Sequence, residues 1–235
     1  MTELASGLFL LNSLQGANVY LLASSTGLTV VDSGLVSDGE SITAQIQELG
    51  FSSSELNNIL LTHGHADHAG GAAWLAEETG ARVTAHRREV PYLEKTKNLP
   101  YRSPLQRLMF WLSDRLLLKR PKTNVDRAVE GGDVIKFSEK LEVIHTPGHT
   151  PGSISYYLPD RRILFCGDAL FNAHPLTGKP GLRPPLPLVS VDNNLAYQSV
   201  VSLAELKVEM LCPGHGKPLL RNAGAAIQAL LKEGR

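Results

Sequence analysis

The chain has 235 residues, with 23 basic and 23 acidic side chains and a formal net charge of zero at pH 7. Because no excess of positive charge is available to neutralise phosphates, we do not expect nucleic acid to be a substrate or partner. The length and a hydrophobic content of 43% are typical of an ordinary soluble protein with a sizeable core, and they suit one large domain or two small ones.

The first half of the chain alternates strand-like runs with helical patterns. Ile42, Ile46 and Leu49 recur at helical spacing behind Asp38, which is a candidate N-cap residue. Strands are expected at the apolar and β-branched runs, namely residues 18–23, 28–31, 58–61 and 82–85.

Residues 87–124 interrupt this alternation and are expected to form a helical, lid-like insertion. One apolar stripe at helical spacing consists of Leu105, Leu108, Met109, Leu112 and Leu116. Other faces of the same segment are apolar too, through Phe110, Trp111, Leu117 and Leu118. A helix that is apolar on several sides is expected to be a core helix, to cover a cleft or to meet a second subunit, which would give a homodimer through residues 100–120.

The second half repeats the style of the first. Strands are expected at residues 125–129, 141–145, 153–158, 163–166 and 208–211, and helices at residues 193–206 and 223–231. Residues 175–187 are rich in proline, which excludes a regular helix or a central strand there and predicts an ordered loop.

Cysteine usage and the N-terminus bear on the compartment. Cys166 and Cys212 are the two cysteines, each lies in an apolar run, and we expect both to be core residues rather than a disulfide or nucleophiles. The sequence begins Met-Thr-Glu, without the basic and apolar regions of a secretory signal, and no membrane span is visible. We therefore expect a cytoplasmic protein with no membrane partner.

The densest group of ligand-type side chains follows the expected strand at 58–61. His63, His65, Asp67 and His68 fall within six consecutive positions, in an H-x-H-x-D-H pattern. Neutral imidazoles and carboxylates are ligands for zinc and related divalent ions. The apolar run before them is typical of a buried strand and the alanine-rich run after them of a helix. The four side chains are therefore expected on a strand-to-helix loop, where a cleft can open.

Three further segments share one layout, a strand-like run, then glycine or proline, then a ligand-type residue. They end at His149 after Thr-Pro-Gly, at Asp168 after Cys-Gly, and at His215 after Cys-Pro-Gly. Strand ends that deliver ligands to one edge of a sheet would converge on one site. By contrast, His145 is expected to close a strand and His174 to lie in a surface loop.

With these motifs in place, the chain resembles the metallo-β-lactamase-fold (glyoxalase II-like) metallohydrolase superfamily over nearly its full length. The resemblance implies an α/β (α+β) fold, a four-layer αβ/βα sandwich of two mixed sheets packed face to face, with helices outside and metals at one sheet edge. It implies a single domain over residues 1–235 with two pseudo-symmetric halves, about 1–124 and 125–235. Carried onto this sequence, the implied ligands are His63, His65 and His149 for one metal, Asp67, His68 and His215 for a second, and Asp168 between them. Asp32 would brace the His-rich loop from behind, as ligating imidazoles require.

The activity that this resemblance implies is dinuclear hydrolysis. Two Zn²⁺ per chain, with iron or manganese as the alternatives, would hold a bridging hydroxide that attacks an ester, thioester or lactone carbonyl of a small to medium metabolite. Asp67 and Asp168 are the candidate catalytic residues, because their carboxylates would orient the hydroxide, and Asp67 or a second water would relay the proton.

Several branches of the superfamily fit less well. Secreted β-lactamases usually carry a cysteine where Asp168 stands, so β-lactam hydrolysis is expected to be at most a side activity. Glyoxalase II enzymes and persulfide dioxygenases follow that aspartate with Gly-Cys-Gly-Arg, which is absent here, and quorum-quenching lactonases place a tyrosine near Phe171. The competing hypotheses are a lactonase, a mononuclear iron persulfide dioxygenase using His63, His149 and Asp168, and a non-catalytic binding module.

Overall fold

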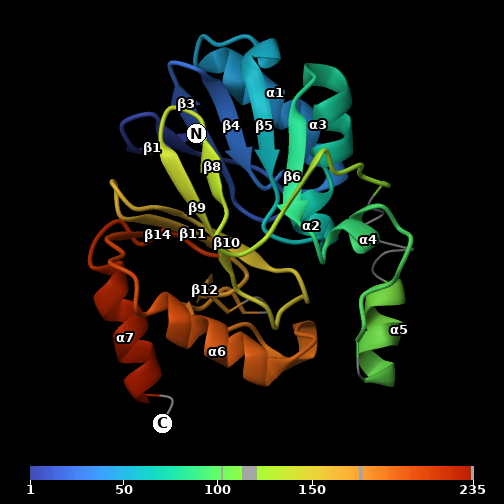
Figure 1. The fold of residues 1–235 in the computed structure, drawn as a ribbon, viewed down its shortest axis with the longest axis vertical. Helices are drawn as coiled ribbons and strands as arrows, with labels where there is room; N and C mark the ends of the chain where they lie inside the picture. Colours follow the sequence, from blue (N-terminus) through green and yellow to red (C-terminus); the bar gives the residue numbers. More distant parts are fainter. Residues whose placement is uncertain (102, 113–120, 175–176, 234–235) are drawn as a thin grey trace. The chain divides into compact units, whose positions relative to one another are not determined.

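The computed structural model describes residues 1–101, 103–112, 121–174 and 177–233. The chain divides into two compact units, Met1–Val129 and Glu130–Arg235, each built on one large sheet (Figure 1). This boundary lies close to the junction expected near residue 124, and the pseudo-symmetry of the halves stays a prediction.

The first unit contains a seven-stranded sheet whose strands stand in sequence order. The strands are β1 (Thr2–Ala5), β2 (Leu8–Leu11), β3 (Val19–Ser24), β4 (Gly27–Val31), β5 (Leu56–Leu60), β6 (Arg82–His86) and β7 (Arg127–Val129). Strands β1 to β4 pair antiparallel, whereas β4 to β7 pair parallel. Parallel neighbours end at the same edge of a sheet, so the residues that follow β4 and β5 are brought together.

Helices fill the connections between the parallel strands. They are η1 (Val36–Asp38), α1 (Gly39–Glu48), η2 (Ser53–Glu55), α2 (Ala66–Ala69), α3 (Ala72–Thr79), α4 (Val90–Leu93) and α5 (Pro104–Leu112). The expected spacing in α1 is confirmed, because Ile42 and Ile46 are fully buried in one core cluster with Leu75 of α3. Asp38 stands at the N-cap position of α1, but its carboxylate accepts N–H groups of Gln15, Gly16 and Leu35 and does not cap that helix.

The apolar faces of α5 correct one expectation. Leu105, Leu108 and Trp111 are 58%, 53% and 55% exposed, so α5 is not a core helix. Apolar residues on several sides of a helix do not determine whether another element packs against it. The composition of the segment therefore could not predict that α5 is exposed. Leu116, Leu117 and Leu118, which extended the predicted stripe, lie outside the described residues.

The second unit contains a five-stranded sheet in the order β14-β11-β10-β9-β8. Its strands are β8 (Val134–Lys136), β9 (Lys140–His145), β10 (Ile154–Leu158), β11 (Ile163–Gly167) and β14 (Met210–Pro213). Strands β8 to β11 pair antiparallel, and β14 pairs parallel with β11. Strands β9, β11 and β14 therefore point the same way and end at one edge.

The remaining elements of the second unit complete a mixed α/β fold. Within the proline-rich segment, β13 (Pro180–Arg183) pairs with β12 (Phe171–Ala173) in a two-stranded sheet and η4 (Pro187–Val189) follows, so the segment is not the loop that was expected. Proline is tolerated there because the sheet has only two strands, both of them edge strands. Residues 175 and 176 lie outside the described part. Helices α6 (Asn193–Leu203) and α7 (Ala223–Glu233) pack on each other and bury Val200, Leu203 and Ile227 (Figure 1). Two large mixed sheets with helices confirm the expected fold class.

No helix in the described part of the chain combines the length and apolarity that crossing a bilayer requires.

Candidate metal centre

The His-rich turn lies directly after β5 in the first unit. His63 and His68 are buried, and His65 precedes α2 as its N-cap residue. The turn is tied to the end of β4, because the backbone N–H and the hydroxyl of Ser33 both donate to the carbonyl of His68, at 2.7 and 2.8 Å. The predicted strand-to-helix loop is confirmed, and its imidazoles are held in a rigid setting.

Asp32 organises the turn from behind, as expected. It is the first residue after β4 and adopts a φ of +62°, a conformation that Asp tolerates better than most residues. Its Oδ1 accepts the backbone N–H of Thr62 at 2.8 Å, and its carboxylate also accepts the Thr62 hydroxyl, at 2.8 and 3.0 Å. Its Oδ2 lies 2.7 Å from Nδ1 of His68, the separation of a charge-assisted hydrogen bond.

These contacts assign the protons of two imidazoles. Nδ1 of His68 must donate, because its partner Asp32 is an acceptor. Nδ1 of His63 lies 3.1 Å from the Thr62 hydroxyl, whose own proton goes to Asp32, so His63 donates there too. Both Nε2 atoms are then left with a lone pair, which is the state in which a neutral imidazole binds a metal.

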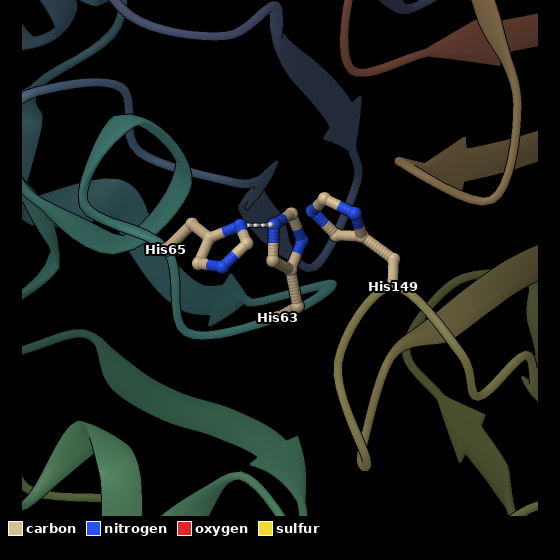
Figure 2. Close-up of side chains that lie close together, drawn as sticks. All are labelled: His63, His65 and His149. Atoms are coloured by element: carbon tan, nitrogen blue, oxygen red, sulfur yellow. Dashed lines mark hydrogen bonds between the residues drawn. The ribbon is translucent and has the colours of Figure 1, made fainter. Parts of the chain in front are cut away.

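His65 faces the imidazole of His63 with its Nδ1, whereas His63 faces it with Nε2. Its Nε2 lies 2.8 Å from the hydroxyl of Tyr101, and its Nδ1 lies 3.1 Å from Nε2 of His63, the contact drawn as a dashed line in Figure 2. Two nitrogens at zinc-ligand distance from one tetrahedral ion are roughly 3.3 Å apart. The facing nitrogens of His63 and His65 therefore fit two ligands of one cation.

Asp67 lies in the first turn of α2, beside the His63–His65 pair in sequence. Its Oδ2 is 3.9 Å from Nε2 of His68, which is too long for a hydrogen bond. The Asp67 side chain is 29% exposed, whereas that of His68 is fully buried. The 2.7 Å contact from His68 to Asp32 is a hydrogen bond, whereas the 3.9 Å separation from His68 to Asp67 is not, so the two carboxylates contact His68 in different ways.

The second unit brings three further side chains together at one sheet edge. His149 follows β9, Asp168 follows β11 and His215 follows β14. Oδ2 of Asp168 lies 3.3 Å from Nε2 of His149 and 3.6 Å from Nε2 of His215. Charge-assisted hydrogen bonds are about 2.7–2.9 Å, so these longer separations suit donors that share a cation better than hydrogen-bonded pairs. One oxygen between two imidazoles is the arrangement expected of a bridging carboxylate.

Glycines hold the two histidines of this unit in place. Gly148, directly before His149, has a φ of +132°, and a Cβ there would collide with the backbone of Ala196 in α6. Gly216, directly after His215, has a φ of +90°, and a Cβ would meet the backbone of Asn172. The Pro-Gly-His and Gly-His-Gly patterns thus serve close packing of the ligand loops.

The remaining histidines and the two cysteines make ordinary structural contacts. His145 closes β9 and its Nε2 contacts the carbonyl of Pro151 at 3.2 Å, as expected. His86 and His174 accept backbone N–H groups through Nδ1. Cys166 and Cys212 are buried free cysteines, which confirms them as core residues.

Two side chains that contact the His-rich turn were not predicted from the sequence. Tyr101 contacts His65, and the carboxylate of Glu89 accepts the N–H of Gly64 at 2.8 Å inside the His-rich turn. Both belong to the insertion at 87–124, and no pattern along the chain links them to partners 36 and 25 positions away. Within the described residues, the His and Asp side chains that fall in groups able to hold a metal ion are His63, His65, Asp67, His68, His149, Asp168 and His215.

Comparisons with known proteins agree with this chemistry. The family model of the metallo-beta-lactamase superfamily matches residues 13–215. A Bacillus subtilis (strain 168) protein described as "Probable metallo-hydrolase YflN" is 30% identical over 221 residues, covering 88% of this chain and 83% of that protein. The hydroxyacylglutathione hydrolase of Brucella ovis is 36% identical over 135 residues, which cover 57% of this chain and 40% of that protein.

A solved structure extends the likeness of fold to almost every residue. The metallo-beta-lactamase family protein TTHA1429 from Thermus thermophilus superposes with a TM-score of 0.73 at 23% identity, covering 99% of this chain and 80% of that chain. Because the family model matches well over half of the sequence, the chain belongs to the metallo-β-lactamase superfamily and is a metal-binding hydrolase.

Proposed function

We propose that the chain is a dinuclear zinc hydrolase that acts on an ester, thioester or lactone carbonyl of a small to medium metabolite. In this proposal His63, His65 and His149 would hold one ion, Asp67, His68 and His215 would hold the other, and Asp168 would contribute to both. The observation that carries it is the set of hydrogen-bond partners that Thr62 and Asp32 provide for His63 and His68. The outer nitrogens of His63 and His68 donate to Thr62 and Asp32, which leaves their inner nitrogens with lone pairs.

The donor set favours zinc among the common divalent ions. Five imidazoles and two carboxylates supply nitrogen and oxygen ligands of borderline character, which zinc accepts readily and which iron or manganese also accept. Both carboxylates also balance part of the charge of two divalent ions. We therefore expect about two zinc ions per chain in a protein purified without chelators.

When bound, two such ions supply an activated water and polarise the substrate carbonyl. The contribution of the protein is to orient and to move the proton. Oδ2 of Asp168 lies close to two imidazole nitrogens, so this oxygen is positioned to fix the water between the ions. Asp67 is assigned the proton relay, because its side chain is 29% exposed and can exchange a proton with solvent.

The substrate class is drawn from the relatives and from one residue. The hydroxyacylglutathione hydrolase relative acts, by its name, on a thioester, and this supports a thioester among the substrates. That match covers only 40% of the relative, and the Gly-Cys-Gly-Arg stretch is replaced by Ala169 to His174 here. Phe171 is 2% exposed, packs edge-on against His149 and His215, and has no hydroxyl to offer a lactone.

The test is a turnover screen on protein of measured zinc content, using thioesters, lactones, phosphoesters and β-lactams. We expect hydrolysis of a carbonyl substrate, with thioesters above β-lactams. Asp168→Ala should lower kcat by at least about 100-fold, in the range that removal of a group stabilising the transition state costs. An Asp168→Ala variant that keeps both metals and full activity would contradict the role assigned to Asp168. A wild-type protein with one iron per chain that produces sulfite from a persulfide would instead be the dioxygenase.

A further inference from the structure

One of the three histidines of the His-rich turn is held differently from the other two. His63 and His68 are oriented by Thr62 and Asp32, at the ends of two central strands. The outer nitrogen of His65 instead faces Tyr101, which lies in the insertion between β6 and α5, with 2.8 Å between Nε2 and the hydroxyl oxygen. The insertion therefore contacts a ligand side chain directly.

The contact is part of a small buried stack. The side chain of Tyr101 is 6% exposed, and its ring lies parallel to that of Phe110 in α5, with 4.1 Å between centroids and 10° between planes. The Phe110 ring in turn stacks on the imidazole of His65, at 5.2 Å and 20°. A hydroxyl and a ring face thus fix both the direction and the plane of the imidazole.

The direction of the imidazole decides whether it can bind a metal. With a proton on Nε2, His65 donates to Tyr101 and keeps the lone pair of Nδ1 toward His63. The other tautomer would place a proton on Nδ1, where it would block a ligand position. Imidazoles that bind metal commonly donate their other N–H to an oxygen, and losing that oxygen typically costs 10–100-fold in metal affinity.

We propose that Tyr101 is a positioning residue for the metal centre, which selects the tautomer and orientation of His65 with the help of Phe110. The inference rests on the proposed function, because it assigns His65 as a ligand. Glu89 anchors the same turn through the N–H of Gly64, so the insertion supports the turn at two points. Through Glu89, Tyr101 and Phe110 the insertion is then part of the structure of the site.

The chain offers a closely matched pair of variants. Tyr101→Phe removes the hydroxyl and keeps the ring in the stack. Tyr157→Phe is the control, because Tyr157 is also 6% exposed and its hydroxyl also makes a 2.8 Å hydrogen bond, to the carbonyl of Lys207, which is no ligand. Each variant loses one buried hydroxyl, so their metal-free forms should lose similar stability.

The readouts are zinc affinity by chelator competition and the visible absorption spectrum of the cobalt-loaded protein. We expect Tyr101→Phe to bind the zinc ion that His65 would hold about 10-fold less tightly than wild type and to shift the cobalt spectrum, and Tyr157→Phe to match wild type in both. Phe110→Leu, which keeps the hydroxyl but removes the stack, should give a smaller loss.

The outcomes separate this inference from the proposed function. A wild-type chain that binds two zinc ions, together with a Tyr101→Phe variant that matches Tyr157→Phe in affinity and spectrum, would overturn the role of Tyr101 alone. A wild-type chain that binds no divalent metal would overturn the proposed function and this role together.

Discussion

At the scale of single residues, the candidate centre is determined by hydrogen bonds on the outer nitrogens of its imidazoles. The carboxylate of Asp32 accepts hydrogen bonds from the Thr62 hydroxyl and from His68. It therefore orients two imidazoles of the candidate centre, His68 directly and His63 through Thr62. The distances separate two kinds of His–Asp contact: 2.7 Å from His68 to Asp32, and 3.3 Å from His149 to Asp168. The first is a hydrogen bond, and the second leaves room for a shared cation.

Asp32→Asn tests this arrangement. The amide cannot accept from Thr62 and His68 at once, so a donor would face a donor and His68 would lose its orientation. We expect zinc affinity at the second site to fall about 10–100-fold. Asp38→Asn is the matched control, because Asp38 is equally buried at 2% exposure but accepts only backbone N–H groups. Equal zinc affinity in the two variants would contradict the role of Asp32.

Cys212 gives a prediction on pH. Burial raises the pKa of its thiol well above the ordinary value, and the neighbouring Cys166 adds to the rise. A raised pKa in the folded state stabilises the fold fully below the ordinary thiol pKa of about 8.5, and this stability is lost as pH rises through the folded pKa. The free energy of unfolding should therefore fall above about pH 8.5, and the slope should be shallower in Cys212→Ala. Equal slopes, measured by urea unfolding at several pH values, would refute this.

At the scale of elements, strong hydrophobic periodicity predicted helices and strands correctly, whereas composition alone did not predict burial. Helix α1 and the paired strands β4 and β5 were expected from Ile42, Ile46 and two apolar runs, and each is present with its apolar side buried. Strands β1, β2 and β8 were not expected, and each is only three or four residues long, too short for a clear periodic pattern. The exposure of α5 could not be predicted, because it depends on what packs against the helix and not on its own residues.

The exposed face of α5 makes a prediction about stability. Leu108→Gln should change the free energy of unfolding by no more than about 0.5 kcal/mol, because the side chain is 53% exposed. Ile46→Ala in α1 should cost about 2–5 kcal/mol, because Ile46 is fully buried in the core. Urea denaturation of both variants gives the comparison, and a similar cost for the two would show that α5 is covered in solution. The homodimer through residues 100–120 stays a prediction, which sedimentation of wild type against Trp111→Gln tests.

At the scale of the whole molecule, the ligand motifs were visible in the sequence because they are short and follow strand ends. Each unit carries an incomplete set, three imidazoles and a carboxylate in the first and two imidazoles and a carboxylate in the second. What the sequence could not reveal is the support behind them, since Tyr101 and Glu89 reach the His-rich turn only through the folded insertion. If the ions bind as proposed, metal binding stabilises the native state.

Chelation tests that consequence. A ligand at 100 times its Kd stabilises the native state by about 2.7 kcal/mol, and for a chain of this size that corresponds to roughly 5–10 °C in Tm. We expect EDTA to lower Tm by about that amount and excess zinc to restore it. Asp38→Asn should respond to EDTA as wild type does. An unchanged Tm in the presence of chelator would show that no metal contributes to the fold.

The most direct test of the central claim is the metal content of purified protein, measured by plasma mass spectrometry for wild type and for His215→Ala. His215 belongs to the second unit and is 28% exposed, so its removal should spare the fold while it opens one ligand position. The account predicts about two zinc ions in wild type and about one in the variant. A single ion in wild type, or the same number in both proteins, would contradict it.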